Sequence, residues 1–367
     1  MQIKFLTFEF TKDNGGIARM MLSIVNALAN EKKSEVKVFT SKYNKNFSKK
    51  NQFIQVDGIS GVGFFLFFLT WVKLLRQKRN EIVLCSRFYP EGLIALLSLK
   101  KIIVFTHASE LLEHPIKIKE FFLGKIRKFV LSSALQVIAN STYTKLLSET
   151  WSSKDNVRCI PLGVNEQKFT SSNSFEGRKR DSFVICSLAR IHSFKGFDVV
   201  FRAICSLSHE MKKDVQYLIA GKGPDLEIEK KKVQELGLID IVSWVGFVEE
   251  NNIADFYSNA DIFVLCTRLD KQGRNVEGFG LVFLEAQSCG TPVIGTRSGG
   301  IPSAIDHENG GFLIEEDDSE GLTKLIKKLY YDRELLAEQG KKARKRVEEA
   351  CTWTHYVEKL LEVLERE

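Results

Sequence analysis

The sequence predicts an α/β protein with two doubly wound domains, each built on a parallel sheet. Strand-like runs that are apolar throughout alternate with helical patterns, which is typical of parallel sheets covered by helices on both faces. The alternation pauses at a polar, weakly periodic segment, residues 167–181, and then resumes. A length of 367 residues suits two domains that each have their own core.

The expected strands fall into two sets of six. They are residues 3–6, 35–39, 82–85, 102–106, 136–139 and 157–160 before the polar segment, and residues 183–187, 216–220, 242–245, 262–265, 292–295 and 311–313 after it. Helical patterns lie between most of them, as at residues 18–30 and 92–98. Ligands bind such sheets at the carboxyl ends of the strands, so we expect a site in a cleft between the two domains.

The cysteines and the N-terminal residues indicate a cytoplasmic protein. Seven cysteines are scattered along the chain with no C-x-x-C pair and no metal-ligand spacing, so we expect reduced thiols and no metal site. The first ten residues, M-Q-I-K-F-L-T-F-E-F, have the pattern of a strand and not that of a signal peptide.

Charge is divided unevenly along the chain. Residues 1–170 hold 26 Lys and Arg against 13 Asp and Glu, a net +13, and residues 171–367 hold 27 against 33, a net −6, which together give the total of +7. The basic residues form no recognisable nucleic-acid-binding motif. We therefore expect the N-terminal half to meet an anionic membrane surface rather than nucleic acid.

Two apolar segments bear on this expectation. Residues 62–72 (V-G-F-F-L-F-F-L-T-W-V) are too few to span a bilayer, which needs about 20 apolar residues. They fit a core helix or an interfacial helix, and the core helix is the favoured interpretation. Residues 116–130 (I-K-I-K-E-F-F-L-G-K-I-R-K-F-V) mix aromatic and basic side chains, which favours a helix lying in the membrane interface.

The most informative motif is a pair of glutamates, Glu277 and Glu285, around a glycine-bearing loop and a short apolar helix, residues 281–288. A helix N-terminus has unpaired N–H groups and about half a positive charge, which suits a phosphate. The glycines let a ligand approach the backbone, and each carboxylate can accept hydroxyls from a sugar or a ribose. A capped surface loop is the alternative interpretation.

Three further clusters are expected at the same edges of the sheets. Gly15 and Gly16 stand at a strand-to-helix turn, where N–H groups suit an anion, although a plain tight turn also fits. Arg190 and Lys195 follow a buried strand and suit a diphosphate, or are solvated surface cations. His107 ends a strand and could donate to a sugar hydroxyl or a leaving oxygen, but a lone histidine is more often structural.

These residues belong to a longer series of motifs that covers most of the chain. The series is N-G-G, T-H-A-S-E, N-S-T-Y-T-K, I-P-L-G-V-N, A-R-I-H-S-F-K-G-F-D, A-G-K-G-P, V-G-F-V, E-G-F-G-L-V-F-L-E-A, C-G-T-P-V-I and S-G-G-I-P. It resembles the retaining, nucleotide-sugar-dependent glycosyltransferases of family 4, which have the GT-B fold. The glutamate pair, the R-x-x-x-x-K spacing before it and T-P-V-I-G after it make the combination specific.

The resemblance implies a domain organisation. Residues 1–166 would form a Rossmann-like domain that binds the acceptor, and residues 181–351 a second one that binds the nucleotide sugar. The two domains would face each other across a cleft. A C-terminal helix, within residues 352–367, would cross back and pack on the first domain.

The resemblance also implies roles for the matching residues. Glu277 would bind the donor sugar, Arg190 and Lys195 would neutralise the departing diphosphate in place of a metal, and His107 would lie near the reacting face of the sugar. Glu285 would hold the ribose. The full set of implied donor-binding residues is Gly15, Gly16, Gly221, Gly223, Val245, Phe247, Val248, Gly278, Phe279, Gly280, Leu281 and Glu285. No cofactor is implied beyond the donor itself.

The expected function is transfer of a hexosyl unit, with retention, from a nucleoside diphosphate sugar to a glycan or a lipid-linked acceptor. Lipopolysaccharide, another cell-surface polysaccharide or a glycolipid would be the product. Loop 268–276 resembles that of mannosyltransferases acting on membrane lipids, which points to GDP-mannose beside UDP-linked sugars. One departure is Ala108, where many relatives have glycine. A non-catalytic nucleotide-sugar-binding protein, a sugar-nucleotide epimerase of the same fold and a glycosidase remain as alternatives.

Overall fold

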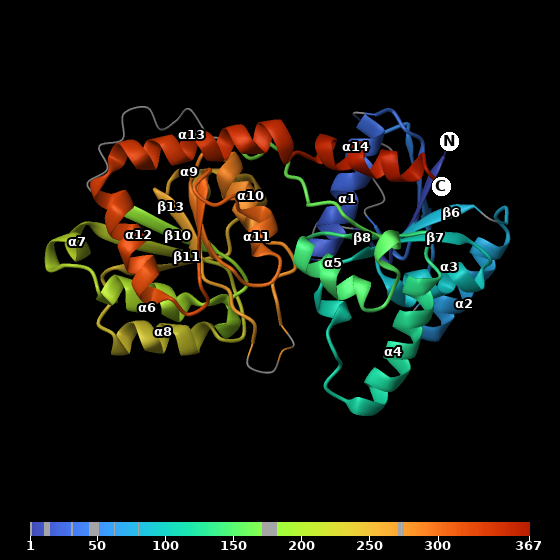
Figure 1. Cartoon of the computed structure of the whole chain (residues 1–367), viewed down its shortest axis with the longest axis horizontal. Helices are drawn as coiled ribbons and strands as arrows, with labels where there is room; N and C mark the ends of the chain where they lie inside the picture. The colour runs from blue at the N-terminus through green and yellow to red at the C-terminus, as the bar shows by residue number, and fades with distance from the viewer. Residues whose placement is uncertain are drawn as a thin grey trace. The chain divides into compact units, whose positions relative to one another are not determined.

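The protein is described by a computed structural model that covers residues 2–10, 15–30, 32–43, 51–61, 63–79, 81–170, 182–270, 273 and 275–367. The chain divides into two compact units (Figure 1). Unit 1 consists of Met1–Leu162 and Trp353–Glu367, and unit 2 of Gly163–Thr352. Each is built around one large parallel sheet covered by helices.

The sheet of unit 1 has seven parallel strands in the order β5-β3-β1-β6-β7-β8-β9. Their bounds are β1 Ile3–Leu6, β3 Val36–Thr40, β5 Ile54–Gly58, β6 Ile82–Cys85, β7 Lys101–Thr106, β8 Gln136–Ala139 and β9 Val157–Cys159. Every residue of β1 is buried, so both faces of the central strands are covered. Two short strands, β2 (Glu9–Phe10) and β4 (Lys42–Tyr43), pair apart from this sheet.

The helices of unit 1 include one that arrives from the end of the chain. They are α1 Gly15–Asn30, α2 Gly63–Leu75, α3 Leu93–Leu97, α4 Lys117–Ser132, α5 Thr142–Glu149 and α14 Trp353–Leu364. Helix α14 contacts α1, buries Tyr356 and Leu360, and is tied by an ion pair of 2.7 Å between Lys32 Nζ and Glu358 Oε1. The predicted return of the C-terminal helix to the first domain is confirmed.

The sheet of unit 2 has six parallel strands in the order β12-β11-β10-β13-β14-β15. Their bounds are β10 Phe183–Leu188, β11 Val215–Ala220, β12 Val242–Gly246, β13 Ile262–Leu265, β14 Val293–Thr296 and β15 Gly311–Ile314. The helices are α6 Phe197–Cys205, α7 His209–Asp214, α8 Leu226–Glu235, α9 Ile253–Ser258, α10 Leu281–Ser288, α11 Ile301–Ala304, α12 Ser319–Tyr331 and α13 Arg333–Ala350.

The predicted pair of doubly wound α/β units is confirmed, although individual elements differ from the expectation. Strand β5 was not expected, because only Ile54 of its five residues is buried and an apolar run is missing. Helix α2 is not the core helix favoured from sequence, since within it only Thr70 and Leu74 are buried. Residues 171–181 of the predicted linker lie outside the described residues. In the parts of the chain that the structure covers, no helix is both long and apolar enough to cross a membrane.

Candidate functional site

The carboxyl edge of the sheet in unit 2 brings Lys195 and Glu277 together. Lys195 ends a short turn, Ser193–Lys195, that follows β10, and Glu277 lies in the loop before α10. Lys195 Nζ is 2.6 Å from Glu277 Oε2, and both side chains are largely buried. The backbone carbonyl of Glu277 also accepts a hydrogen bond of 2.8 Å from the N–H of Gly300, which follows β14. A lysine and a carboxylate from distant parts of the sequence therefore share one site.

Two glycines are required where these turns lie against their neighbours. Gly196 follows Lys195 with φ +73°, and a Cβ on it would lie 1.9 Å from the carbonyl oxygen of Cys266. Gly280 precedes α10 with φ +95°, and its Cβ would lie 2.6 Å from the ring of Phe283. Both backbone conformations are ones that residues with a side chain rarely adopt. The turn with Lys195 and the start of α10 are thus held in close contact with the sheet edge.

The start of α10 is suited to an anion. The predicted helix over residues 281–288 is confirmed as Leu281–Ser288, and its first turn has no acidic residue to occupy the N–H groups. Gly280 offers no side-chain cap, and Phe279 is buried at 2% exposure, so the backbone itself forms the helix entrance. Unpaired N–H groups and the helix dipole attract negative charge at such a position.

Glu285 lies one turn into α10, where a buried tyrosine orients its carboxylate. The Tyr257 hydroxyl donates a hydrogen bond of 2.9 Å to Glu285 Oε2. Burial, and then the charge of Glu285, raise the pKa of Tyr257 well above its ordinary value, so the phenol keeps its proton and remains a donor. Tyr257 is fully buried in α9 and was not predicted, because nothing in the local sequence marks it.

The other predicted donor-binding residues follow neighbouring strands. Gly221 and Gly223 follow β11. A Cβ on Gly221 would lie 1.9 Å from the carbonyl oxygen of Ala189, and a Cβ on Gly223 would lie 2.0 Å from that of Ile191, which is too close for either glycine to be replaced. These two glycines therefore let the loop after β11 contact the loop after β10. Val245, Phe247 and Val248 lie at the end of β12, and the ring of Phe247 is 64% exposed.

Arg190 lies in the same loop as Ile191, between β10 and the turn with Lys195. It is exposed, and its guanidinium makes no hydrogen bond or ion pair with any residue that the structure describes. Lys195 is by contrast already paired with Glu277. The two cations at this edge are therefore in different states, one held by a carboxylate and one open to an anionic ligand.

An arginine that was not predicted holds the turn on which Lys195 lies. Arg268, just after β13, donates from its backbone N–H to the carbonyl of Phe194 at 2.9 Å and from Nη2 to that of Ser193 at 3.3 Å. Its guanidinium also pairs with Asp198 and with Asp317. Burial opposes ionisation of Asp198, but hydrogen bonds to Arg268 and Arg202 hold its pKa below the ordinary value. A charged network thus fastens the turn to the sheet.

In unit 1, His107 lies at the carboxyl end of β7 and is buried. Its Nε2 is 2.8 Å from the carbonyl oxygen of Ser86, and its backbone N–H donates to Glu110 Oε1 at 2.6 Å. A carbonyl oxygen can only accept, so Nε2 carries the proton. Burial lowers the pKa of His107 below 6.5, so the ring is neutral at pH 7 and Nδ1 is an acceptor. The sequence predicted that this ring could donate a hydrogen bond to a sugar hydroxyl or a leaving oxygen. In the structure its N–H is instead directed at Ser86, and only the acceptor Nδ1 remains for a ligand.

Glu91 was not predicted either, and it joins the strand ends around His107. Its Oε1 accepts hydrogen bonds from the Ser86 hydroxyl at 3.0 Å and from the N–H of Phe8 at 3.3 Å. Burial raises the pKa of Glu91, although several hydrogen bonds and the charge of Arg87 act in the opposite direction. A single acid within an apolar run was the available sequence signal. Glu91 thus links the ends of β1 and β6 to the carbonyl that orients His107.

Ala108, the departure noted in the sequence, has a strained backbone. Its φ of 78° and ψ of −63° form a γ-turn, and the N–H of Ser109 donates to the carbonyl of His107 at 3.2 Å. This turn is rare for a residue with a side chain and costs about 1–3 kcal/mol. Glycine would adopt it without strain.

Gly15 and Gly16 form the first residues of α1, and Asn14 before them lies outside the described residues. Gly15 has φ +85°, and a Cβ on either glycine would meet no atom within 4 Å. Among the residues that the structure describes, none therefore lies against these two positions. His107 and these glycines belong to unit 1, whereas Arg190, Lys195, Glu277 and Glu285 belong to unit 2.

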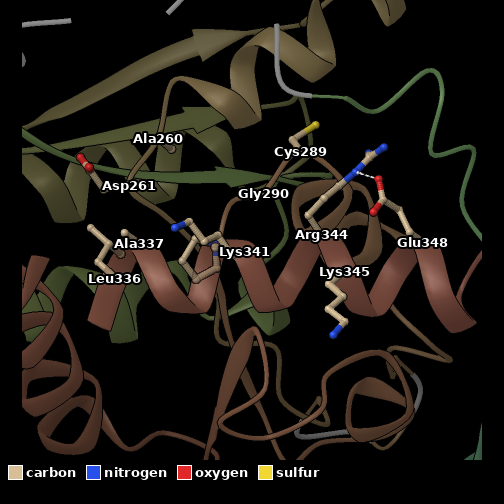
Figure 2. Close-up of a pocket in the computed structure, with 12 residues that line it drawn as sticks. Ala260, Asp261, Cys289, Gly290, Leu336, Ala337, Lys341, Arg344, Lys345 and Glu348 are labelled. Carbon is tan, nitrogen blue, oxygen red and sulfur yellow. Dashed lines mark hydrogen bonds and ion pairs between the residues drawn. The ribbon is translucent and has the colours of Figure 1, made fainter. Parts of the chain in front are cut away.

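A groove in unit 2 lies away from the predicted residues. Figure 2 shows it between α13 and the residues that precede β13 and β14, at the amino edge of the sheet, with Arg344 turned toward Glu348. Arg344 Nη1 donates to the carbonyls of Ser288 at 2.6 Å and Phe169 at 2.8 Å, and thereby caps the end of α10. This arginine stabilises the fold and is not part of the carboxyl-edge site.

Two family models match the chain in succession. The model described as Glycosyltransferase Family 4 matches residues 14–168, and the model described as Glycosyl transferases group 1 matches residues 169–346. The first covers most of unit 1, and the second contains every predicted site residue of unit 2. Together they leave only the ends of the chain unmatched.

Individual proteins are similar to parts or to the whole of the chain. The GDP-mannose-dependent alpha-(1-6)-phosphatidylinositol monomannoside mannosyltransferase of Mycobacterium tuberculosis is 27% identical over 61% of this chain and 60% of its own length. The N-acetyl-alpha-D-glucosaminyl L-malate synthase of Bacillus anthracis is 32% identical over 45% of this chain and 41% of its own length. The chain therefore matches about half of each relative's length.

Among solved structures, that of Anabaena Alr3699/HepE in complex with UDP covers 100% of both chains with a TM-score of 0.80 at 16% identity. At this identity the likeness concerns the fold alone. It shows that the chain has the GT-B fold expected from the sequence.

Proposed function

Because the chain belongs to the glycosyltransferase family that these two models describe, we propose that it transfers a hexosyl unit from a nucleoside diphosphate sugar to an acceptor hydroxyl, with retention at the anomeric carbon. One observation carries the proposal. At the carboxyl edge of unit 2, the Lys195–Glu277 pair, the open guanidinium of Arg190 and the start of α10 all follow the ends of buried parallel strands. This combination suits a sugar joined to a diphosphate.

The proposed reaction depends on stabilising the leaving group. Arg190 and Lys195 would balance the charge that develops on the diphosphate as the sugar departs, and the N–H groups at the start of α10 would bind a phosphate oxygen. These groups supply the positive charge that a metal ion supplies in other transferases. We therefore propose that transfer is metal-independent.

Glu277 has two tasks in this proposal. Its carboxylate holds Lys195 Nζ at 2.6 Å, and its remaining acceptor capacity would bind hydroxyls of the donor sugar. Glu285, oriented by Tyr257, would accept the ribose hydroxyls. The neutral His107 would accept a hydrogen bond from the acceptor or the donor sugar. With no carboxylate assigned as nucleophile, we propose that the acceptor attacks from the face the diphosphate leaves, and that a phosphate oxygen takes its proton.

The donor and the acceptor are proposed from the relatives' names. The mycobacterial relative is named for GDP-mannose and a phosphatidylinositol monomannoside, and the Anabaena structure contains UDP. We therefore propose GDP-mannose or a UDP-sugar as the donor, and a glycan or lipid-linked acceptor in the synthesis of a cell-surface polysaccharide or glycolipid.

A lipid-linked acceptor also requires access to a membrane. The N-terminal half is basic, and α4 exposes Phe121 and Phe122 at 55% and 58% beside its lysines. On the opposite face of α4 the buried Arg127 pairs with Glu120 at 2.9 Å and lies 4.6 Å from the centre of the Trp151 ring. These contacts fix the orientation of the helix, so that the two phenylalanines face solvent. We propose that α4 attaches the protein peripherally to an anionic membrane, on its cytoplasmic side.

Thermal-shift screening of UDP-, GDP- and ADP-sugars tests donor binding directly, since a ligand that binds the folded state raises Tm. Lys195→Ala should then lower turnover by about 10²–10³-fold. Lys324→Ala, a lysine exposed on α12, is the matched control and should leave turnover unchanged.

Near-normal turnover in Lys195→Ala would contradict the proposed leaving-group role. Tight binding of a donor without release of nucleoside diphosphate would favour a binding protein, and an altered sugar nucleotide as product would favour an epimerase. Formation of the opposite anomer, measured by NMR of the product, would contradict retention.

A further inference from the structure

Helix α2 presents an apolar stripe to solvent. Phe64, Phe65, Phe68 and Leu75 are 82%, 65%, 44% and 40% exposed, and we call these four residues the α2 stripe. The spacing from Phe64 to Phe68 and on to Leu75 keeps the stripe on one face of the helix. The only polar side chain in the first turns of α2, that of Thr70, is buried instead. The usual arrangement of an amphipathic surface helix is thus reversed.

The helix is fixed in this orientation by specific contacts. The indole Nε1 of Trp71 donates to the carbonyl of Leu97 at 3.0 Å, and Leu74 is buried in the core of unit 1. Beyond the helix, Nζ of the buried Lys100 donates to the carbonyl of Gln77 at 3.0 Å. Because these contacts hold the last turns of α2 against unit 1, the orientation of the helix, and with it the exposure of the stripe, is set by the folded unit.

The surroundings of the stripe are apolar and basic. Leu97 and Leu99, which are 48% and 51% exposed, extend the apolar surface at the end of α3. Residues 58–80 contain no Asp or Glu, whereas Arg76, Lys78 and Arg79 follow α2 and are exposed. The combination of inserted aromatic rings and adjacent cations is what an anionic lipid surface binds.

We propose that the α2 stripe inserts into the acyl region of an anionic membrane, next to the headgroups that Arg76, Lys78 and Arg79 contact. The inference extends the peripheral attachment proposed for α4 and does not depend on which reaction unit 2 performs. A second copy of the chain is the competing occupant. A two-fold dimer through the stripe would bring two basic clusters together with no acid in residues 58–80 to neutralise them, so a bilayer is favoured.

The proposal gives membrane binding two separable components. Attraction between exposed cations and anionic lipid is screened at high salt, where the Debye length falls to about 3 Å at about 1 M. Insertion of aromatic rings depends on buried apolar area and is not weakened by salt. Protein recruited by charge should therefore remain partly bound after a high-salt wash.

The test uses the full chain with vesicles of phosphatidylcholine alone and vesicles of phosphatidylcholine and phosphatidylglycerol in equal parts. Phe64→Ser/Phe65→Ser should lower the salt-resistant bound fraction on the anionic vesicles by about tenfold or more, because each ring loses its apolar burial. Ile228→Ser/Ile239→Ser is the matched control, since both side chains lie in unit 2 and are 56% and 62% exposed. Tm and nucleoside diphosphate binding should stay unchanged in both variants.

Equal salt-resistant binding of the stripe variant and the unchanged protein would overturn the proposal, as would no binding of the unchanged protein to anionic vesicles. A dimer in solution that becomes monomeric in the stripe variant would overturn it in favour of a second copy. Loss of membrane binding with nucleotide binding and turnover intact supports it. Failure of the proposed function would instead appear as absent donor binding or turnover in a protein that still binds vesicles, so the two failures are distinguishable.

Discussion

Arg268 is predicted to position Lys195, and Arg268→Ala tests this. The substitution keeps the backbone hydrogen bond to Phe194 but removes the donor to Ser193 and both ion pairs of the guanidinium. The turn Ser193–Lys195 would then be fastened to β13 by one hydrogen bond instead of two. Lys195 itself, and its distance from the diphosphate site, are changed only through this turn.

The size of the effect follows from the burial of each partner. The Asp198 side chain is 16% exposed, so losing a hydrogen bond to it costs about 1.5–3 kcal/mol. The Asp317 side chain is 55% exposed, so that pair contributes about 0–1 kcal/mol. Asp198 keeps Arg202 at 2.7 Å, so the fold should survive. A catalytic group displaced by about 1 Å loses about 10²-fold in rate, and we expect a fall in kcat of about 10–10²-fold.

The assay is a double-mutant cycle on kcat with Arg268→Ala, Lys195→Ala and the double variant. If Arg268 acts through Lys195, its removal should have little further effect once Lys195 is gone. Arg268→Lys, which keeps the charge but not the fork, should recover only part of the loss. Arg333→Ala, whose partner Asp261 lies at the amino edge at 3.5 Å, should be neutral. The same fold-loss from Arg268→Ala in both backgrounds would refute the positioning role.

Three further predictions concern single residues. Ala108→Gly should be neutral or stabilising, whereas Ala27→Gly in α1 should lower the free energy of unfolding by about 1–2 kcal/mol through chain entropy and a lost methyl group. The difference between the two free energies of unfolding in urea measures the strain at Ala108, and equal losses at the two sites would remove the strain argument. Burial lowers the folded-state pKa of His107 below 6.5, so the unfolded chain binds a proton more readily and the free energy of unfolding should fall as pH drops below about 6.5. His107→Asn should flatten that part of the curve of Tm against pH, and superimposable curves for the two proteins would contradict this prediction. Tyr257→Phe removes the donor to Glu285 Oε2 and should weaken nucleoside diphosphate binding about tenfold by calorimetry, while unchanged affinity would show that Glu285 needs no such support.

The parts of the site that were predictable are those where one local pattern decides both structure and chemistry. Glycines before an apolar helix mark the start of α10, and the observed bounds Leu281–Ser288 match the expected residues. Arg190 and Lys195 follow an apolar strand, and the end of its apolar run in the sequence already indicates where the carboxyl end of that strand lies. Parallel strands end at a common edge, so side chains just after them can be grouped without a structure.

The residues that were missed act through contacts between distant segments. Tyr257 reaches Glu285 across 28 positions, and Arg268 reaches Ser193 across 75. No local period reports which buried tyrosine or which loop arginine lies beside the site. The proton on His107 is equally nonlocal, because it depends on the Ser86 carbonyl at the end of the neighbouring strand.

Helix α2 shows a different reason for failure. A helix that is apolar nearly all round is assigned to a core by default, because burial within the same chain is the commonest way to remove such a surface from water. The core of unit 1 accepts only one side of α2, and the α2 stripe is left outside. The sequence left a core helix and an interfacial helix open and favoured the core helix, and the observed exposure agrees with the second alternative, on which the proposal above rests. The apolar pattern of α2 indicates that its surface favours burial, and the basic residues beside the helix favour an anionic membrane as the partner that buries it.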